Sequence, residues 1–139
     1  MSVSFHSEQL NFRLLKIKLH RQWIEMIISN HSRKTGNINF IFTSNKYILE
    51  LNREYLNHSY FTDVITFDYS DGDEISGDIY ISKEQVKINS LDYGLRLEDE
   101  LRRVMVHGVL HLMGFSDSAP EEKIEMRSEE DKSLKIWRV

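Results

Sequence analysis

VMVHGVLHLMGF, residues 104–115, is the most apolar stretch of this chain, and two histidines interrupt it. We predict that it belongs to a helix that runs from about Leu97 to Met113 and packs at the centre of the fold. Gly114 is suited to ending this helix in a left-handed conformation. His107 and His111 are four residues apart, so they share one face of the helix, with β-carbons roughly 5–6 Å apart.

The pattern H-x-x-x-H-x-x-G-x-x-D predicts a metal site formed by His107, His111 and Asp117. Two imidazoles at this spacing can hold one metal ion at about 2.0–2.1 Å each, and the turn at Gly114 lets the aspartate complete the set. Three protein ligands leave a fourth position for water, which is typical of catalytic zinc. We therefore expect one Zn²⁺ per chain, although two histidines and a carboxylate also suit other divalent metals.

Gly108 stands where the H-E-x-x-H signature of metallopeptidases has its glutamate. That glutamate is the general base of those enzymes, so peptide hydrolysis here would need another base. Its absence favours a different hydrolase reaction and leaves a metallopeptidase as the alternative. The glycine also leaves space beside the metal, for a bulky substrate or for a closely packed strand.

The composition is that of a globular protein, and we expect one domain over residues 1–139. The chain has no cysteine, which excludes disulfides and thiolate zinc sites. It shows neither a secretory signal nor an apolar run of the roughly 20 residues that span a bilayer, so we expect a cytoplasmic protein without membrane contact. Residues 1–60 carry eight Lys and Arg against four Asp and Glu, and residues 61–139 carry ten against eighteen. The first half could therefore present a basic face to phosphates, or only a solvated surface of uneven charge.

The remaining pattern is mixed rather than strictly alternating, which favours an α+β fold with helices packed on a small sheet. Gly36-Asn37 indicates a turn, and Ser118-Ala-Pro-Glu121 has the spacing of a helix capping box. A close pair of β-rich runs, 63–68 and 77–82, predicts a hairpin. The other expected elements are strands at 38–43 and, more weakly, 2–5, and helices at about 16–29, 45–53, 82–91 and from residue 120 to about 135.

The segment HGVLHLMGFSD, residues 107–117, resembles the signature of the YbeY family of bacterial endoribonucleases, H-G-x-L-H-L-x-G-Y-D-H. The resemblance extends to LNREY at 51–55, TDVITF at 62–67 and GDIYIS at 77–82, in the family's order. It implies a compact fold in which a mixed four-stranded sheet packs with four to five helices. It also implies a zinc-dependent, single-strand-specific endoribonuclease of the cytoplasm, acting on ribosomal RNA and ribosomal particles. The implied roles are 3′-end maturation of small-subunit 16S rRNA and ribosome quality control.

This sequence departs from the family pattern at two positions. Asp117 takes the place of the family's third histidine, and Leu56 that of an arginine thought to face the active site. Arg53, one helical turn before Leu56, is our candidate catalytic residue because it could bring a guanidinium to the same space, or else it is a surface residue. Asp63 and Asp78 are possible bases or partners of the histidines. A non-catalytic, zinc-containing ribosome assembly factor is a further alternative.

Overall fold

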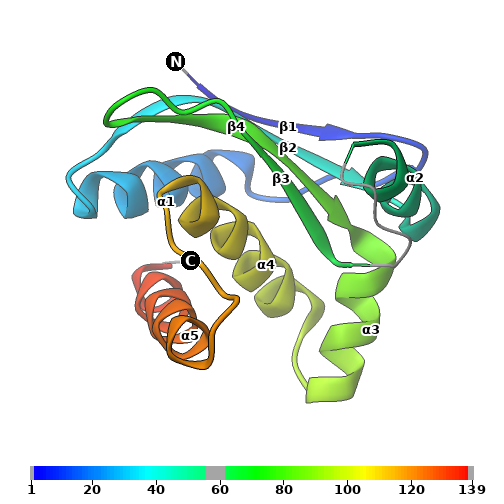
Figure 1. Ribbon diagram of the computed structural model, residues 1–139. Helices are drawn as coiled ribbons and strands as arrows, with labels where there is room; N and C mark the ends of the chain where they lie inside the picture. The colour runs from blue at the N-terminus through cyan, green and yellow to red at the C-terminus, as the bar shows by residue number, and fades with distance from the viewer. Residues whose placement is uncertain (1, 56–61, 138–139) are drawn as a thin grey trace.

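Four strands form one mixed sheet within residues 2–55 and 62–137, the part of the chain that the computed structural model describes (Figure 1). They are β1 (Val3–Ser7), β2 (Lys34–Thr43), β3 (Val64–Asp68) and β4 (Glu74–Ser82), and they lie in the order β1-β2-β4-β3. β2 pairs in parallel with β1 and β4, whereas β3 and β4 pair antiparallel as the predicted hairpin.

Five helices accompany the sheet in the same part of the chain, which confirms the predicted α+β fold. They are α1 (Ile17–Asn30), α2 (Asn45–Tyr55), α3 (Lys83–Tyr93), α4 (Leu97–Leu112) and α5 (Pro120–Ile136). In Figure 1, α1 and α4 lie under the sheet, and α5 lies beyond them. One main core joins the sheet to these helices. A smaller core, formed by Ile48, Leu51 and Ile65, packs α2 on the other face, because side chains alternate along a strand.

The predicted central helix is α4, and its apolar residues explain its position. Met105, Val106, Val109 and Leu110 are fully buried, so this helix has to lie between other elements. At Gly108 the helix approaches β4 so closely that an added β-carbon would lie 2.7 Å from Cγ2 of Ile79. The glycine therefore accommodates a closely packed strand.

Gly114 ends the α4 region as expected, with a φ of 97°. In that left-handed conformation its own N–H donates to the carbonyl of His111 at 3.0 Å, and the N–H of Phe115 donates to that of Leu110, also at 3.0 Å. Glycine adopts this backbone conformation without the steric cost that a β-carbon brings. The chain consequently reverses direction three residues after His111.

Two local predictions are wrong. Gly36-Asn37 is not a turn between elements but lies inside β2, where the pairing register with β4 shifts between Thr35 and Ile38. The N–H of Asn37 donates to Oγ of Ser76 at 3.1 Å, so the turn-like pair forms an irregularity that the neighbouring strand satisfies.

The capping box before α5 is displaced by one residue from its predicted position. The helix is capped by Ala119 rather than Ser118, and the side chain of Glu122, not Glu121, accepts from the N–H of Ala119 at 2.8 Å. Alanine has no side-chain acceptor, so only the glutamate half of a capping box forms.

Within residues 2–55 and 62–137, no helix has both the length and the apolar character needed to cross a membrane.

His20 gives the fold a dependence on pH that can be measured. This residue of α1 is only 3% exposed, and its Nδ1 lies 3.0 Å from the carbonyl oxygen of Lys16. Burial lowers the pKa of His20 below its ordinary 6.5, and the charge of Arg102 lowers it further. The unfolded chain therefore binds the proton more readily, and stability is lost as pH falls from 6.5 towards the folded pKa. In that window we expect His20 to contribute a slope of up to about 1.4 kcal/mol per pH unit.

Urea denaturation of wild type and His20→Gln between pH 7.5 and 5 would measure this slope. The free energy of unfolding of His20→Gln should fall less steeply with falling pH than that of the wild type. His6→Gln, at an exposed histidine, should show the same slope as the wild type. Parallel stability curves for wild type and His20→Gln would contradict the prediction.

Candidate metal centre

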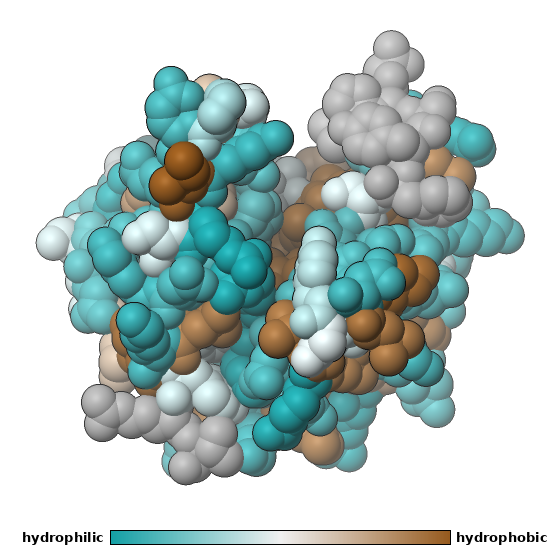
Figure 2. Space-filling view, turned by 90° about the horizontal axis from the view of Figure 1, so that it is seen from below, coloured by the Kyte–Doolittle hydropathy of each residue, from teal (hydrophilic) through white to brown (hydrophobic). Residues whose placement is uncertain are grey.

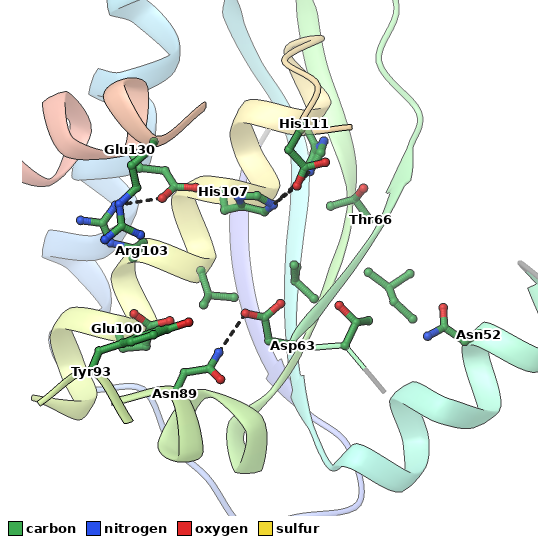
Figure 3. A pocket seen from close by; sticks show the side chains of 16 residues that line it. Asn52, Asp63, Thr66, Asn89, Tyr93, Glu100, Arg103, His107, His111 and Glu130 are labelled. Atoms are coloured by element: carbon green, nitrogen blue, oxygen red, sulfur yellow. Dashed lines mark hydrogen bonds and ion pairs between the residues drawn. The ribbon is translucent and has the colours of Figure 1, made fainter. Parts of the chain in front are cut away.

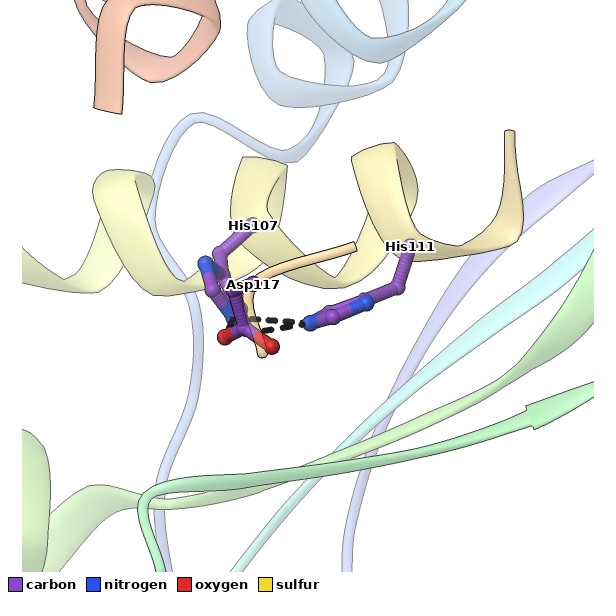
Figure 4. A group of neighbouring side chains, drawn as sticks. All are labelled: His107, His111 and Asp117. Carbon is purple, nitrogen blue, oxygen red and sulfur yellow. Dashed lines mark hydrogen bonds and ion pairs between the residues drawn. The ribbon is translucent and has the colours of Figure 1, made fainter. Parts of the chain in front are cut away.

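Three side chains predicted from the sequence as metal ligands converge at the end of α4 and in the loop that follows (Figure 4). Nε2 of His107 lies 3.0 Å from Nε2 of His111. Oδ2 of Asp117 lies 3.3 Å from the first of these nitrogens and 3.6 Å from the second. The helical spacing brings the two rings together, and the reversal at Gly114 brings the carboxylate back to them.

These separations match what one tetrahedral ion requires. Donor atoms at about 2.0–2.1 Å from a shared ion are roughly 3.3–3.4 Å apart when they occupy corners of a tetrahedron. The three observed distances, 3.0, 3.3 and 3.6 Å, lie on both sides of that value. Two imidazole nitrogens facing each other at 3.0 Å also need a shared proton or a cation between them. The residues therefore fit a divalent metal ion.

Glu130 holds the ring of His107 in this orientation. One carboxylate oxygen lies 2.6 Å from Nδ1 of His107, so the ring donates there and turns Nε2 towards Asp117. The other oxygen accepts from Arg103 at 2.8 Å, and Arg103 also donates to Asp131 at 2.8 Å. A carboxylate behind a ligating imidazole sets the tautomer and increases its basicity.

The pKa values of the two histidine rings are shifted in opposite directions. Burial alone would lower the pKa of His107, but the hydrogen bond and the charge of Glu130 raise it above the ordinary value. Burial alone would raise the pKa of Glu130, but the same bond to His107, together with Arg103, holds it below its ordinary value. Burial and the neighbouring charge of His107 both lower the pKa of His111, which favours a neutral ring with a free lone pair.

The sequence did not identify Glu130, which follows His107 by 23 residues in a helix rich in acidic residues. Glu130→Ala is expected to weaken metal binding, measured with Zn²⁺ as the probe ion, about 10–100-fold, because His107 loses the group that orients it. Glu130→Gln, which keeps an acceptor without the charge, should weaken it less. Competition with a chromophoric chelator would measure both affinities.

The matched control is Glu129→Ala at the neighbouring position, whose carboxylate contacts His31 and Lys132 instead. This variant should bind the probe ion with the affinity of the wild type. Equal affinities for Glu130→Ala and Glu129→Ala would show that Glu130 has no such role.

A pocket of about 730 Å³ extends from the three converging side chains towards β3, α2 and α3 (Figure 3). Seen from the side of the helices, the surface is hollowed between the α5 and α3 sides, with hydrophilic side chains on the α5 side and less hydrophilic ones on the α3 side (Figure 2). The pocket's polar and charged lining consists of Asn52, Thr62, Asp63, Thr66, Asn89, Tyr93, Glu100, Arg103, His107, His111, Asp117, Arg127 and Glu130.

The other predicted site residues lie in different places. Arg53 is exposed on α2 and does not line the pocket, whereas its neighbour Asn52 does. Leu56 lies outside the described residues. Asp63 lines the pocket, but Asp78 lies on the opposite face of the sheet, where it accepts from Asn39 at 3.0 Å. Asp78 is therefore not a partner of the histidines.

The guanidinium groups of this pocket are those of Arg103 and Arg127, within the part of the chain that the structure describes. Neither comes from residues 1–60, the half in which the sequence suggested a basic face for phosphates. Helix packing, rather than the regional charge balance, therefore decides which cations border the pocket.

Comparison with known proteins places this arrangement in a family. The family model for endoribonuclease YbeY matches residues 3–138. The chain is 45% identical over 137 residues to the endoribonuclease YbeY of Flavobacterium psychrophilum, covering 99% of this chain and 97% of that relative. It is 40% identical over 136 residues to the endoribonuclease YbeY of Parabacteroides distasonis, covering 98% and 96% respectively.

A solved structure shares the fold. The solution structure of TM1509 from Thermotoga maritima matches with a TM-score of 0.67 and 26% identity, over 96% of this chain and 87% of that one. The sequence matches span nearly the whole chain, including α4 and the loop that carries Asp117. The resemblance seen in the sequence is thus confirmed, and the chain belongs to the endoribonuclease YbeY family, a family of hydrolases that act on RNA.

Proposed function

We propose that this protein is a zinc-dependent, single-strand-specific endoribonuclease of the cytoplasm. Its proposed work is ribosomal RNA processing, in particular 3′-end maturation of small-subunit 16S rRNA, and ribosome quality control. The observation that carries the proposal is the convergence of His107, His111 and Asp117 at the edge of an open polar pocket, in a chain of the YbeY family.

The proposed ligands are those three side chains, with one Zn²⁺ per chain. Two imidazoles and one carboxylate leave a fourth tetrahedral position. A bound zinc ion supplies Lewis acidity and lowers the pKa of a coordinated water to about 7. Asp117, in place of a third histidine, adds a negative charge and reduces the Lewis acidity of the ion somewhat. This donor set also suits other divalent metals, so elemental analysis of the purified protein has to establish the ion.

The remaining groups of the pocket suit the charges of an RNA backbone. Arg127 is exposed and borders the pocket, so its guanidinium is placed to pair with phosphate oxygens. Arg53 is exposed on the same helical turn as Asn52 and stays our sequence-based candidate for a second such contact. A single-stranded substrate suits the site because unpaired bases can be splayed apart and read.

The decisive experiment maps the 3′ ends of 16S rRNA in cells whose chromosomal gene for this protein is deleted and which carry a plasmid copy of the gene. We expect the wild-type copy to restore mature ends and His107→Ala to leave precursors, at equal protein levels. Rescue by His107→Ala would contradict catalysis and favour a non-catalytic assembly factor.

A purified-protein assay separates the hydrolase classes. Single-stranded and structured RNAs and a panel of peptides would be incubated with the protein, with and without a chelator. Chelator-sensitive cleavage of single-stranded RNA is expected, since Gly108 provides no general base of the metallopeptidase type. Chelator-sensitive cleavage of peptides alone would overturn the proposal in favour of a metallopeptidase.

A further inference from the structure

A second group of oxygen atoms lies in the same pocket, away from the histidines. Asp63, immediately before β3, and Glu100, near the start of α4, both line the pocket (Figure 3). Between them in the figure, Asn89 of α3 donates from Nδ2 to Oδ2 of Asp63 at 3.2 Å. The two carboxylates thus come from different elements, and tertiary packing brings both to one pocket, where the charge of Asp63 acts on Glu100.

One oxygen of these two carboxylates lacks a partner, although Asn89 also offers a side-chain hydrogen bond to Glu100. Glu100 is 4% exposed, and its Oε1 has no hydrogen-bond donor among the residues that the structure describes. Leaving a buried acceptor unsatisfied is costly, and the cost is larger for a charged group. Burial raises the pKa of Glu100, and the negative charge of Asp63 raises it further. The pair is therefore short of positive charge.

The nearby guanidiniums do not supply that charge fully. Arg103 already donates to Glu130 and Asp131, and Arg127 is exposed. Four carboxylates and two guanidiniums line the whole pocket. One divalent ion at the histidines would bring these charges to neutrality, yet the substrate of an endoribonuclease carries a negative charge on every phosphate. A further cation would favour entry of that substrate.

We propose that Asp63 and Glu100 form a second cation site, for a hard divalent ion such as Mg²⁺ or Mn²⁺. The donors are oxygen atoms, which suit these ions, whereas the imidazoles suit zinc. Magnesium typically binds through one or two carboxylates and keeps several waters, which substrate phosphates then replace. Binding of the ion alone is independent of the proposed function. Only the further step, in which an RNA phosphate replaces waters on the ion, rests on the proposed function.

Electron paramagnetic resonance of Mn²⁺ tests this site in the zinc-loaded full-length protein. Titration should reveal one bound Mn²⁺ per chain, displaced by excess Mg²⁺. Glu100→Gln and Asp63→Asn should each weaken Mn²⁺ binding at least about tenfold, since removing a ligand costs no less than removing a group that orients one. Zinc content, measured on the same samples, should stay unchanged.

Two control variants match the chemistry of these substitutions. Glu98→Gln alters an exposed carboxylate of the same helix, which pairs with Arg96. Asp78→Asn alters the carboxylate on the opposite face of the sheet. Both should bind Mn²⁺ like the wild type.

The outcomes for the two sites are distinguishable. His111→Ala should lose zinc and retain the Mn²⁺ bound at Asp63 and Glu100. Zinc-loaded wild type that retains no Mn²⁺, or that binds it equally in both pocket variants, would overturn the second site while leaving the zinc site intact. A wild type that takes up no zinc, together with Mn²⁺ bound by His111→Ala, would refute the zinc proposal and support the second site.

Discussion

His111→Ala is expected to abolish stoichiometric zinc binding and to lower the rate of RNA cleavage by at least about 100-fold. Even removing a group that only orients a ligand costs about 10–100-fold in affinity or activity, so removing a ligand has a larger effect. The remaining His107 and Asp117 would offer the ion only two of the three converging donors. Elemental analysis and cleavage of a labelled single-stranded RNA would measure the two losses.

His31→Ala is the matched control for this prediction. His31 is comparably exposed, with 25% of its side chain accessible against 27% for His111, and it contacts Glu129 rather than the pocket. We expect this variant to retain zinc and activity. Full zinc occupancy in His111→Ala, with a normal circular dichroism spectrum, would refute the assignment of this residue as a ligand.

Gly108→Val is expected to lower the free energy of unfolding by about 2–3 kcal/mol, the upper part of the range for overpacked cores. The first carbon of any side chain at this position would lie 2.7 Å from Cγ2 of Ile79. That atom branches directly from the β-carbon of a residue in β4, so it cannot swing away like the end of a long side chain. Urea denaturation of the metal-free protein would measure the change without a contribution from metal binding.

A double-mutant cycle with Ile79→Ala tests whether this contact is the cause. Ile79→Ala alone should cost about 2–5 kcal/mol, because it leaves a cavity between β4 and α4. In the double variant the valine occupies part of that cavity, so the combined loss should be clearly smaller than the sum. Strictly additive losses would show that helix and strand do not meet at these two residues.

The local geometry of the candidate metal centre could be predicted from the sequence. A helix places residues four apart on one face, so His107 and His111 had to be neighbours once residues 97–112 were helical. Gly114 then permits the left-handed turn that brings Asp117 back to them. The two strands of the hairpin could also be predicted, because each is a short β-rich run. In the structure the turn at Asp71–Asp73 separates them.

Local periodicity could not reveal which distant residues complete the site. The sequence offered Asp78 and Arg53 near the histidines, whereas packing directs Asp78 to the opposite face and brings Asn52 to the pocket. Likewise, Gly36-Asn37 has the composition of a turn but joins β2, because Ser76 of the neighbouring strand accepts its N–H.

The sequence by itself determined that three side chains within a stretch of eleven residues lie close together. Helix period and glycine conformation are local properties that act over one or two turns of chain. Only the tertiary structure decided that Glu130 orients His107 and that Glu100 and Asp63 line the same pocket. Several acidic residues of α5 have the same local pattern, and the one that meets the imidazole depends on how α5 packs against α4. That choice is made by the buried apolar surface shared between the helices, which no single segment encodes.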